Sequence, residues 1–426
     1  MYLEKLEISN YKMFDNIKLE FEPGFNIILG DNGVGKTTIL EAASVAISGF
    51  LTGMEDVPTR NIYKQDVRYE IVKDSMGIPN KIYNDESTQI RSVLKYNDKS
   101  YEWVRAKKNS SSSTKTTMNP KDIQDVSQKL INSMQAVLPL ISYQSAARHW
   151  LTARADADVK KIKQLHDRRC GYLGCLDRKL NLNSVYDWCM QMEWNSIKAH
   201  KEPQNYKTFM KIISDFMCYM NDGVESEVIY DVNSRKLLYV EKGICKEIED
   251  LSAGYQSILS LIIDLAYRIS VLNPDIGDNI SKVEGIVLID EIDSNLHPKW
   301  QWKIVEAITQ IFPNVQFIAA THSPIIISSC KNAHIINISD GEIEYISDSY
   351  AYSVNEILRD MLGYHMQPAI IENLIEKFEN ELDEENFDEA KSALNSLEKL
   401  LGQEHAKVIA LKSEYKLEVG NDNDIH

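Results

Sequence analysis

Two hydrophobic patterns alternate along the first part of the chain. Residues 3–8 and 16–21 alternate apolar with polar side chains, which predicts two half-buried antiparallel strands. The segment Phe25–Leu29 is continuously apolar, as expected of a strand that is buried on both faces. A glycine-rich loop follows, and small and apolar residues then recur at helical spacing from Thr37 to Phe50. This stretch therefore predicts strands, a tight loop and a helix.

The same two patterns continue through the rest of the chain. Strands are expected at residues 67–72, 89–96, 101–108, 138–143, 226–231, 236–241, 285–290, 316–320, 334–339 and 342–346. Helices are expected within residues 146–222, at 253–272 and at 298–311. Two hairpin turns are predicted, at Asn233–Ser234 and at Ser339–Gly341, and the polar stretch 109–120 predicts a linker.

Strands that alternate with helices are typical of an α/β protein with a mainly parallel sheet. The chain has 426 residues, and a single core rarely exceeds about 250–300 residues, so at least one accessory lobe is expected. We predict a head formed by residues 1–145 and 246–350, with an antiparallel β subdomain in the first of these segments. A helical lobe is expected at 146–245 and a helical tail at 351–426.

The tail predicts a helical hairpin. Residues 369–383 and 387–401 carry apolar side chains at every third or fourth position, and Gly402 stands where a helix would end. The apolar stripe either docks on the head or forms a platform for self-assembly or for a partner. The sequence leaves both readings open.

Composition narrows the class of protein. Hydrophobic residues make up 43% and charged residues 26%, as in ordinary globular proteins. The longest apolar runs are far shorter than the roughly 20 residues of a membrane span, and the N-terminus has no signal-peptide pattern, so a cytoplasmic protein without a membrane partner is expected.

The net charge of −16 does not favour a main DNA-binding surface. Cys170 and Cys175 resemble half a metal site, but reduced, buried thiols are the preferred interpretation.

The strongest chemical signal is the segment Gly30–Thr38, GDNGVGKTT. It matches the phosphate-binding loop G-x-x-x-x-G-K-[ST] and stands between a buried strand and a helix, the context that this loop requires. Backbone N–H groups and the helix N-terminus would face the phosphates of ATP, Lys36 would reach the β- and γ-phosphates, and the Thr37 hydroxyl would bind Mg²⁺. The candidate nucleotide-binding residues here are Asn32, Gly33, Gly35, Lys36, Thr37 and Thr38.

A second element is the apolar strand Ile286–Ile289, which ends in Asp290 and Glu291. Asp290, at the carboxyl end of the strand, is the candidate Mg²⁺ ligand, and Glu291 the candidate catalytic group that orients or deprotonates the attacking water. Such a strand is common by itself, but together with the phosphate-binding loop it predicts an ATPase.

Three further motifs, one before the Asp290 strand and two after it, complete the order found in ABC ATPases. Leu251–Ser257, LSAGYQS, resembles the signature motif, Asp293–Pro298 resembles the D-loop, and Thr321–Ser323 resembles the switch-histidine loop. The chain thus resembles ABC-type ATPases of the SMC/RecF-like branch over residues 1 to about 50 and about 138 to 346. The resemblance implies an ABC-type P-loop ATPase head with a mainly parallel sheet.

The resemblance also implies roles for particular residues. His322 would contact the γ-phosphate and sense hydrolysis. Ser252 and Gly254 would bind ATP held by a second copy of the chain, and Asp293 would couple the two sites. The active unit would be a head-to-tail dimer with two shared sites. This dimer would stand alone or form part of a higher oligomer.

Two further assignments rest on position within the resemblance. Gln144, just after a predicted strand, stands where the family has its Q-loop glutamine, a ligand of Mg²⁺ and of the catalytic water; the alternative is an ordinary loop glutamine. Lys12 stands where this branch often has an arginine near the nucleotide, and a solvated lysine is the alternative. Ala253 and Tyr255 depart from the commoner signature LSGGQ, which suggests the hypothesis of slow hydrolysis.

The amino-acid sequences around the signature, Asp290 and His322 most resemble those of the compact ATPases of bacterial anti-phage systems, namely the ATPase subunits of Septu-type and retron-associated defence. That resemblance implies a separate HNH endonuclease as the partner, which the tail would dock. The alternative is a RecF-like repair or recombination clamp that grips DNA directly with Lys107, Lys108 and Lys115. A transporter subunit is disfavoured. A steep salt dependence of DNA binding by the ATPase alone would distinguish the clamp.

Overall fold

The computed structural model describes residues 1–111, 113–146, 167–177, 182–339, 341–346, 350, 352–361 and 368–422. The chain forms two compact units, Met1–Tyr352 and Ser353–His426. The strands are β1 (Tyr2–Tyr11), β2 (Phe14–Glu20), β3 (Phe25–Gly30), β4 (Tyr69–Lys73), β5 (Pro79–Tyr83), β6 (Thr88–Tyr96), β7 (Lys99–Lys107), β8 (Thr117–Asn119), β9 (Leu140–Gln144), β10 (Ser226–Asp231), β11 (Lys236–Glu241), β12 (Ile244–Glu247), β13 (Gly285–Ile289), β14 (Val315–Ala320), β15 (His334–Ser339) and β16 (Glu342–Ile346). The helices of the first unit are α1 (Lys36–Leu51), α2 (Asp122–Asn132), α4 (Leu182–Ala199), α5 (Gln204–Met220), α6 (Ala253–Leu272), α7 (Pro298–Gln301), α8 (Ile304–Ile311) and α9 (Pro324–Ser329).

The centre of the first unit is a six-stranded sheet in the order β16-β15-β3-β14-β13-β9. Every neighbouring pair is parallel except β15 and β16. All residues of β3, β13 and β14 are buried, which explains why their sequences are continuously apolar. The prediction of a mainly parallel sheet is confirmed.

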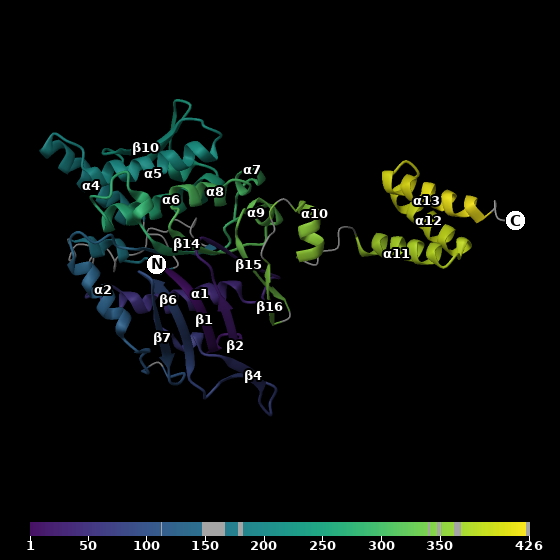
Figure 1. The fold of residues 1–426 in the computed structure, drawn as a ribbon, viewed down its shortest axis with the longest axis horizontal. Helices are drawn as coiled ribbons and strands as arrows, with labels where there is room; N and C mark the ends of the chain where they lie inside the picture. Colours follow the sequence, from purple (N-terminus) through teal and green to yellow (C-terminus); the bar gives the residue numbers. More distant parts are fainter. Residues whose placement is uncertain are drawn as a thin grey trace. The chain divides into compact units, whose positions relative to one another are not determined.

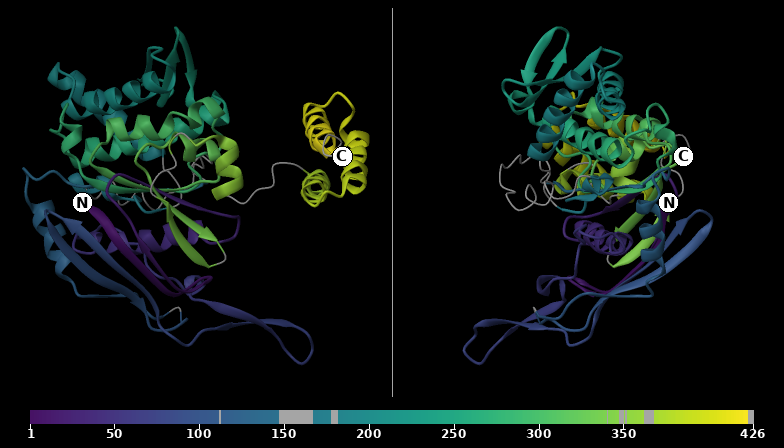
Figure 2. Two further views of the ribbon diagram at one scale, coloured as in Figure 1. Left: turned by 45° about the vertical axis from the view of Figure 1, so that its right-hand side comes forward. Right: turned by 90° about the vertical axis from the view of Figure 1, so that its left-hand side faces the viewer.

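A second, antiparallel sheet has the order β2-β1-β6-β7-β8. Helix α1 contacts strands of both sheets, and its residues share one hydrophobic core with them. Because α1 is buried along most of its length, most of its residues are apolar or small, and its buried Glu41 is paired with Lys12. Figure 1 shows the antiparallel sheet on one side of this arrangement and helices α4, α5 and α6 on the other. The hairpin β4–β5 is exposed and extends away from the body (Figure 2).

Helix α6 packs against α5 and β9. Among the described helices it alone is long and apolar enough to cross a membrane, but 83% of that window is buried inside the structure. It is therefore a core helix of this fold. The hairpin of β10 and β11 spans the predicted residues, and β12 extends it to three strands.

Several predicted elements needed correction. The helix expected at 298–311 is two helices, α7 and α8, and the end of the predicted linker forms β8 on the edge of the antiparallel sheet. Residues 147–166 and 178–181 of the expected helical lobe, and Asp340 of the last expected turn, lie outside the described residues.

The second unit contains α10 (Val354–Glu356), α11 (Ala369–Asp383), α12 (Phe387–Leu401) and α13 (Ala406–Asp422). Gly402 ends α12 with a positive φ of 90°, as predicted. The structure has three packed helices where a hairpin of two was expected. Val408 and Leu411 of α13 pack against the apolar residues of α11 and α12 in one core. Much of the stripe is thus buried within the unit itself, an arrangement that neither of the two sequence-based readings had foreseen.

Candidate functional site

Residues of the phosphate-binding loop, the strand ending in Asp290 and the switch-histidine loop meet in one cavity of about 230 Å³ at the carboxyl ends of β3, β13 and β14. Ligands of open α/β sheets bind at this edge because loops and helix N-termini converge there. The lining residues are Met13, Asn32, Gly33, Gly35, Lys36, Thr37, Thr38, Asp290, Glu291, Ala320, Thr321 and His322.

The loop between β3 and α1 has a shape that only glycine permits at two positions. Gly30 has φ 138°, and a Cβ there would come within 2.4 Å of the Ile338 carbonyl oxygen. Gly35 has φ 102°, and its Cβ would collide with Met13 and Phe14. The tight loop leads directly into α1, so its backbone N–H groups and the helix N-terminus belong to the same cavity.

Lys36 is the buried cation of the cavity, with 7% of its surface exposed. Its Nζ donates to the carbonyl oxygens of Gly30 at 2.7 Å and Asp31 at 2.9 Å. Burial lowers the pKa of Lys36, and nearby carboxylates, Asp290 first among them, act in the opposite direction. The ammonium is thus held by weak neutral acceptors in a place where a phosphate oxygen would be a stronger partner.

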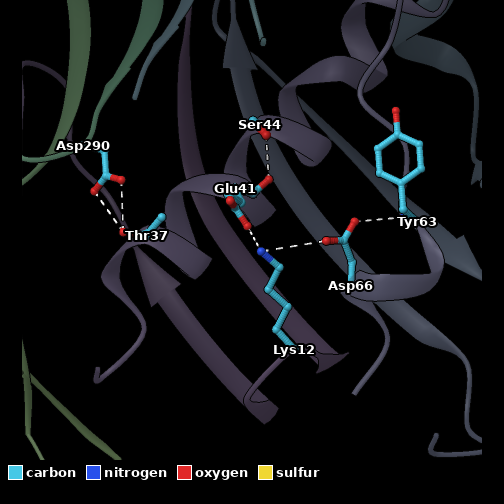
Figure 3. A network of polar contacts seen from close by, with 7 residues as sticks. All are labelled: Lys12, Thr37, Glu41, Ser44, Tyr63, Asp66 and Asp290. Carbon is cyan, nitrogen blue, oxygen red and sulfur yellow. Dashed lines mark hydrogen bonds and ion pairs between the residues drawn. The ribbon is translucent and has the colours of Figure 1, made fainter. Parts of the chain in front are cut away.

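Thr37 and Asp290 form the candidate metal centre. The Thr37 Oγ1 lies 3.1 Å from Asp290 Oδ1 and 3.0 Å from Oδ2 (Figure 3). A hydroxyl and a carboxylate are the hard oxygen ligands that Mg²⁺ prefers, and Mg²⁺ takes few protein ligands beside phosphate oxygens and water. The donor set therefore fits Mg²⁺.

The residues after β13 and β14 are tied together. Glu291 lines the cavity with a left-handed backbone, φ 47°, a conformation that is uncommon outside glycine and is found at functional sites. Asp293 accepts a hydrogen bond from the Thr321 hydroxyl, which in turn accepts one from the Ser323 N–H at 3.0 Å. The D-loop and the switch loop are thus one hydrogen-bonded unit.

His322 also lines the cavity. Its pKa is lowered, first by burial and then by the positive charge of Lys36. A lowered pKa favours the neutral imidazole at neutral pH, since protonation would require a more acidic medium. The side chain can therefore act there as a hydrogen-bonding group rather than as a cation.

Gln144 is not brought into the lining of the cavity. It is 3% exposed, and its Nε2 donates to Asp264 Oδ2 at 2.6 Å and to Ser142 Oγ at 2.8 Å. Asp264 also binds the buried Arg268, at 2.9 Å. The predicted Mg²⁺ ligand is engaged by a buried ion pair on α6, so in this state the structure ties Gln144 to the signature helix instead.

Lys12 is neither a lining residue nor a solvated lysine. Its Nζ is paired with the buried Glu41 of α1 and lies 3.8 Å from the buried Asp66. Figure 3 shows the lysine pointing between these two carboxylates. The neighbouring Met13 lines the cavity, which the sequence did not single out because an exposed methionine carries no chemical signal.

The signature residues Ser252 and Gly254 stand at the N-terminus of α6, outside the lining of the cavity. Ser252 is exposed and makes no side-chain cap hydrogen bond. Gly254 lies against the D-loop, where a Cβ would come within 2.8 Å of the Asn295 carbonyl oxygen. Tyr255, which departs from the commoner signature, packs on Trp300 with ring centroids 4.6 Å apart and donates to Glu241 at 3.0 Å.

Of the lysines assigned to a DNA grip, Lys107 is 2% exposed and donates to backbone carbonyls. Its ammonium therefore does not lie on the open surface, where a duplex would rest. Lys108 and Lys115 are exposed.

Two family profiles match the chain. One is described as an AAA domain and covers residues 5–215, and the other, an AAA domain described under the AbiEii toxin and type IV toxin–antitoxin systems, covers residues 226–328. Together they span most of the chain, and both correspond to the elements that build the cavity. Both profiles describe ATPase domains, and the protein is an ATPase.

Its relatives are more specific. The chain is 29% identical over 396 residues to the retron Vc95 probable ATPase of Vibrio cholerae, covering 80% of this chain and 74% of that protein. It is 26% identical over 436 residues to Septu protein PtuA of Bacillus thuringiensis, covering 94% of each. The chain is thus similar to Septu PtuA and retron ATPases over most of its length, as the sequence motifs indicated.

Two other likenesses are partial or distant. One match, to DNA replication and repair protein RecF of Bifidobacterium adolescentis, is 45% identical, but over only 49 residues or 12% of this chain. An Smc head domain from Pyrococcus furiosus is 14% identical with a TM-score of 0.48, covering 84% of this chain and 98% of that one.

Proposed function

We propose that this ATPase closes two copies of itself around ATP and Mg²⁺ and thereby regulates an HNH endonuclease in an anti-phage defence complex. The two named relatives, a Septu protein and a retron ATPase, support the setting. The observation that carries the proposal is the separation of Ser252 and Gly254 from the cavity that holds Lys36 and Asp290. One copy supplies the phosphate-binding loop, and the signature of a second copy completes the site.

The exposed N-terminus of α6 suits this role. Ser252 offers a hydroxyl without a side-chain cap bond, and a helix of 20 residues directs its positive end to the same place. A helix N-terminus and a free hydroxyl are good donors to phosphate oxygens. A second copy can therefore bind the γ-phosphate from the side opposite Lys36.

The chemistry within one copy follows from the lining residues. Thr37 and Asp290 would hold Mg²⁺, which neutralises charge on the phosphates when bound. Glu291 orients or deprotonates the attacking water, and the neutral His322 donates a hydrogen bond to the γ-phosphate. Asp293, bound to Thr321, transmits the state of one site to its neighbour.

The second unit is the proposed docking element for the nuclease. Its own core is complete, but Ile370, Leu400, Ile409 and Leu417 expose between 50% and 68% of their surface. Apolar side chains on helix faces are the usual anchors for a partner segment. Tagged purification should recover a small HNH nuclease in a stoichiometric amount. DNA alone, lost steeply as salt rises, would contradict the partner and favour the RecF-like clamp.

A mixing experiment tests the shared site. Lys36→Ala removes the phosphate contact, Ser252→Arg blocks the signature, and each variant alone should be nearly inactive. Hybrid dimers in the mixture contain one composite site with both elements intact, so ATP hydrolysis should recover to a sizeable fraction of the unmodified rate. The control mixes Lys36→Ala with the double variant, which forms no intact site. Full activity of Ser252→Arg alone would refute a shared site.

A further inference from the structure

A second cavity, separate from the ATP site, opens on the antiparallel side of the first unit. Its volume is about 870 Å³. It lies between the segment before β4, the end of β5 and the loop that connects β7 to β8. The lining residues are Asn61, Ile62, Tyr63, Lys64, Gln65, Tyr83, Lys107, Thr114, Lys115 and Thr116.

The charge of this wall is one-sided. The described lining contains Lys64, Lys107 and Lys115 and no carboxylate, although the whole chain has a net charge of −16. The buried Asp66, next in sequence to the lining residue Gln65, accepts a hydrogen bond from the Tyr63 N–H at 2.9 Å and lies 3.8 Å from the Lys12 ammonium. The cavity therefore concentrates positive potential in an acidic protein.

Lys107 is held in the way in which Lys36 is held in the phosphate-binding loop. It is 2% exposed, and its Nζ donates to the carbonyl oxygens of Ser111, at 2.9 Å, and of Thr114. A buried ammonium with only neutral acceptors lacks the counter-charge that usually accompanies burial. An anion entering the cavity would supply it.

Arg105 is a second buried cation beside this cavity. It is 3% exposed and donates through one guanidinium nitrogen to the Arg60 carbonyl oxygen and the Asn61 side chain, both at 3.0 Å. Its Nε has no partner among the described residues. Burial lowers the pKa of Arg105 to about 10. Since Asn61 lines the cavity, this guanidinium stands directly behind the wall.

Two tyrosines border the same cavity. Tyr63 is 47% exposed and Tyr83 is half-buried. The Arg60 guanidinium lies 5.2 Å from the centre of the Tyr63 ring, and the Lys64 ammonium 5.3 Å from that of Tyr83. Aromatic rings next to cations are the groups on which nucleic-acid bases stack while their phosphates are bound.

We propose that this cavity binds the phosphate of a nucleotide without a metal ion, with the base against Tyr63 or Tyr83. Lys64, Lys107 and Lys115 contact the phosphate, and Arg105 stabilises its charge from behind. The shared chemistry is a nucleotide phosphate, whether at the end of a single strand or in a free mononucleotide. The site does not depend on ATP-driven dimerisation or on the nuclease proposed above.

The test measures fluorescence anisotropy of a short oligothymidylate that carries a 5′-phosphate and a 3′ fluorophore, in EDTA. The full-length protein carries Lys36→Ala, so the ATP site does not contribute. The phosphorylated strand should bind about tenfold more tightly than the same strand without phosphate, because charge-assisted hydrogen bonds are lost with the phosphate. Thymidine monophosphate and inorganic phosphate serve as competitors. If the mononucleotide competes at a concentration similar to that of the strand, the ligand is a free nucleotide. If only strands compete, the ligand is the end of a strand.

The matched variants are Lys64→Ala and Lys115→Ala, both at exposed positions, with Lys99→Ala at the exposed start of β7 as the control. Each of the first two should weaken binding about three- to tenfold and reduce its salt dependence, because one phosphate contact is lost, and Lys99→Ala should leave it unchanged. Lys107→Gln, which keeps a polar group at the buried position, should weaken it further. Equal binding by Lys64→Ala, Lys115→Ala and Lys99→Ala, or no binding of any probe, would overturn the proposal.

Discussion

Lys36 and Lys107 are two buried lysines with nearly the same immediate contacts and opposite surroundings. Each is less than 10% exposed, and each donates to two backbone carbonyls of a loop that bends around it. Around Lys36, however, Asp31, Asp290, Glu291 and Asp293 all act on the charge. The cavity of Lys107 has no carboxylate among its described lining residues.

The difference separates two ways of binding a phosphate. Carboxylates beside Lys36 repel a bare polyphosphate, so that site suits a phosphate accompanied by a divalent cation, with Thr37 and Asp290 as its ligands. The cavity of Lys107 suits a phosphate by itself. The two sites also lie in different parts of the fold. The carboxylates follow the ends of parallel strands, whereas Lys107 is the last residue of β7, the strand next to the edge strand β8 of the antiparallel sheet.

Removal of divalent cations should produce the largest difference in function between the two sites. In EDTA, ATP hydrolysis should be abolished, because the divalent cation that Thr37 and Asp290 are proposed to hold would be removed from the phosphates. Binding of the phosphorylated oligothymidylate should change by less than about twofold, since its contacts are lysines. Both are measured on one preparation, and restored hydrolysis on adding Mg²⁺ is the control. Loss of strand binding in EDTA would remove the distinction between the sites.

Lys36→Ala should have the next largest effect and should act on one site only. Loss of a buried, charged hydrogen-bond donor should weaken ATP binding about 10- to 100-fold, as measured by calorimetry. Binding of the phosphorylated strand should keep its affinity. Lys64→Ala is the reciprocal variant, with ATP affinity unchanged. A parallel loss of both ligands in either variant would mean that the two cavities are parts of one site.

The strand, loop and helix around Lys36 could be predicted from the sequence because their geometry is local. Gly30, Gly35 and Lys36 belong to one short loop whose shape follows from glycine conformation and the adjoining strand and helix. Asp290 was predictable because a buried strand ends there. These features require few contacts with distant parts of the chain.

The environments of Gln144, Lys12 and Lys107 could not be predicted in this way. Each depends on partners far along the chain or on a loop that folds back: Asp264 for Gln144, Glu41 and Asp66 for Lys12, and the carbonyls of Ser111 and Thr114 for Lys107. A polar residue on a strand or turn gives no periodic signal of such a partner. The third helix of the tail was missed for a similar reason, because its Val408 and Leu411 acquire meaning only against α11 and α12.

The smallest predicted effect concerns a link between the two cavities. Tyr63 lines the second cavity, and its N–H donates to Asp66 at 2.9 Å. The backbone carbonyl of Asp66 accepts from the Lys12 N–H at 2.8 Å, and the Asp66 carboxylate lies 3.8 Å from the Lys12 ammonium, which is paired with Glu41. Figure 3 shows this chain of contacts reaching α1, the helix that begins with Lys36 and Thr37. A ligand that shifts Tyr63 therefore acts on a buried charge network connected to the phosphate-binding loop.

We expect saturating phosphorylated strand to change the affinity for ATP by about threefold, a coupling typical of single networks of this kind. Asp66→Ala should abolish that change while leaving the two separate affinities nearly intact, because Asp66 lines neither cavity. Asp85→Ala, at an exposed position near the same hairpin, is the matched control and should retain the coupling. ATP titrations with and without the strand measure it. If Asp66→Ala retains the coupling, the coupling does not pass through Asp66. Lys36 and Lys107 then bind phosphate by similar chemistry but are not connected through Lys12.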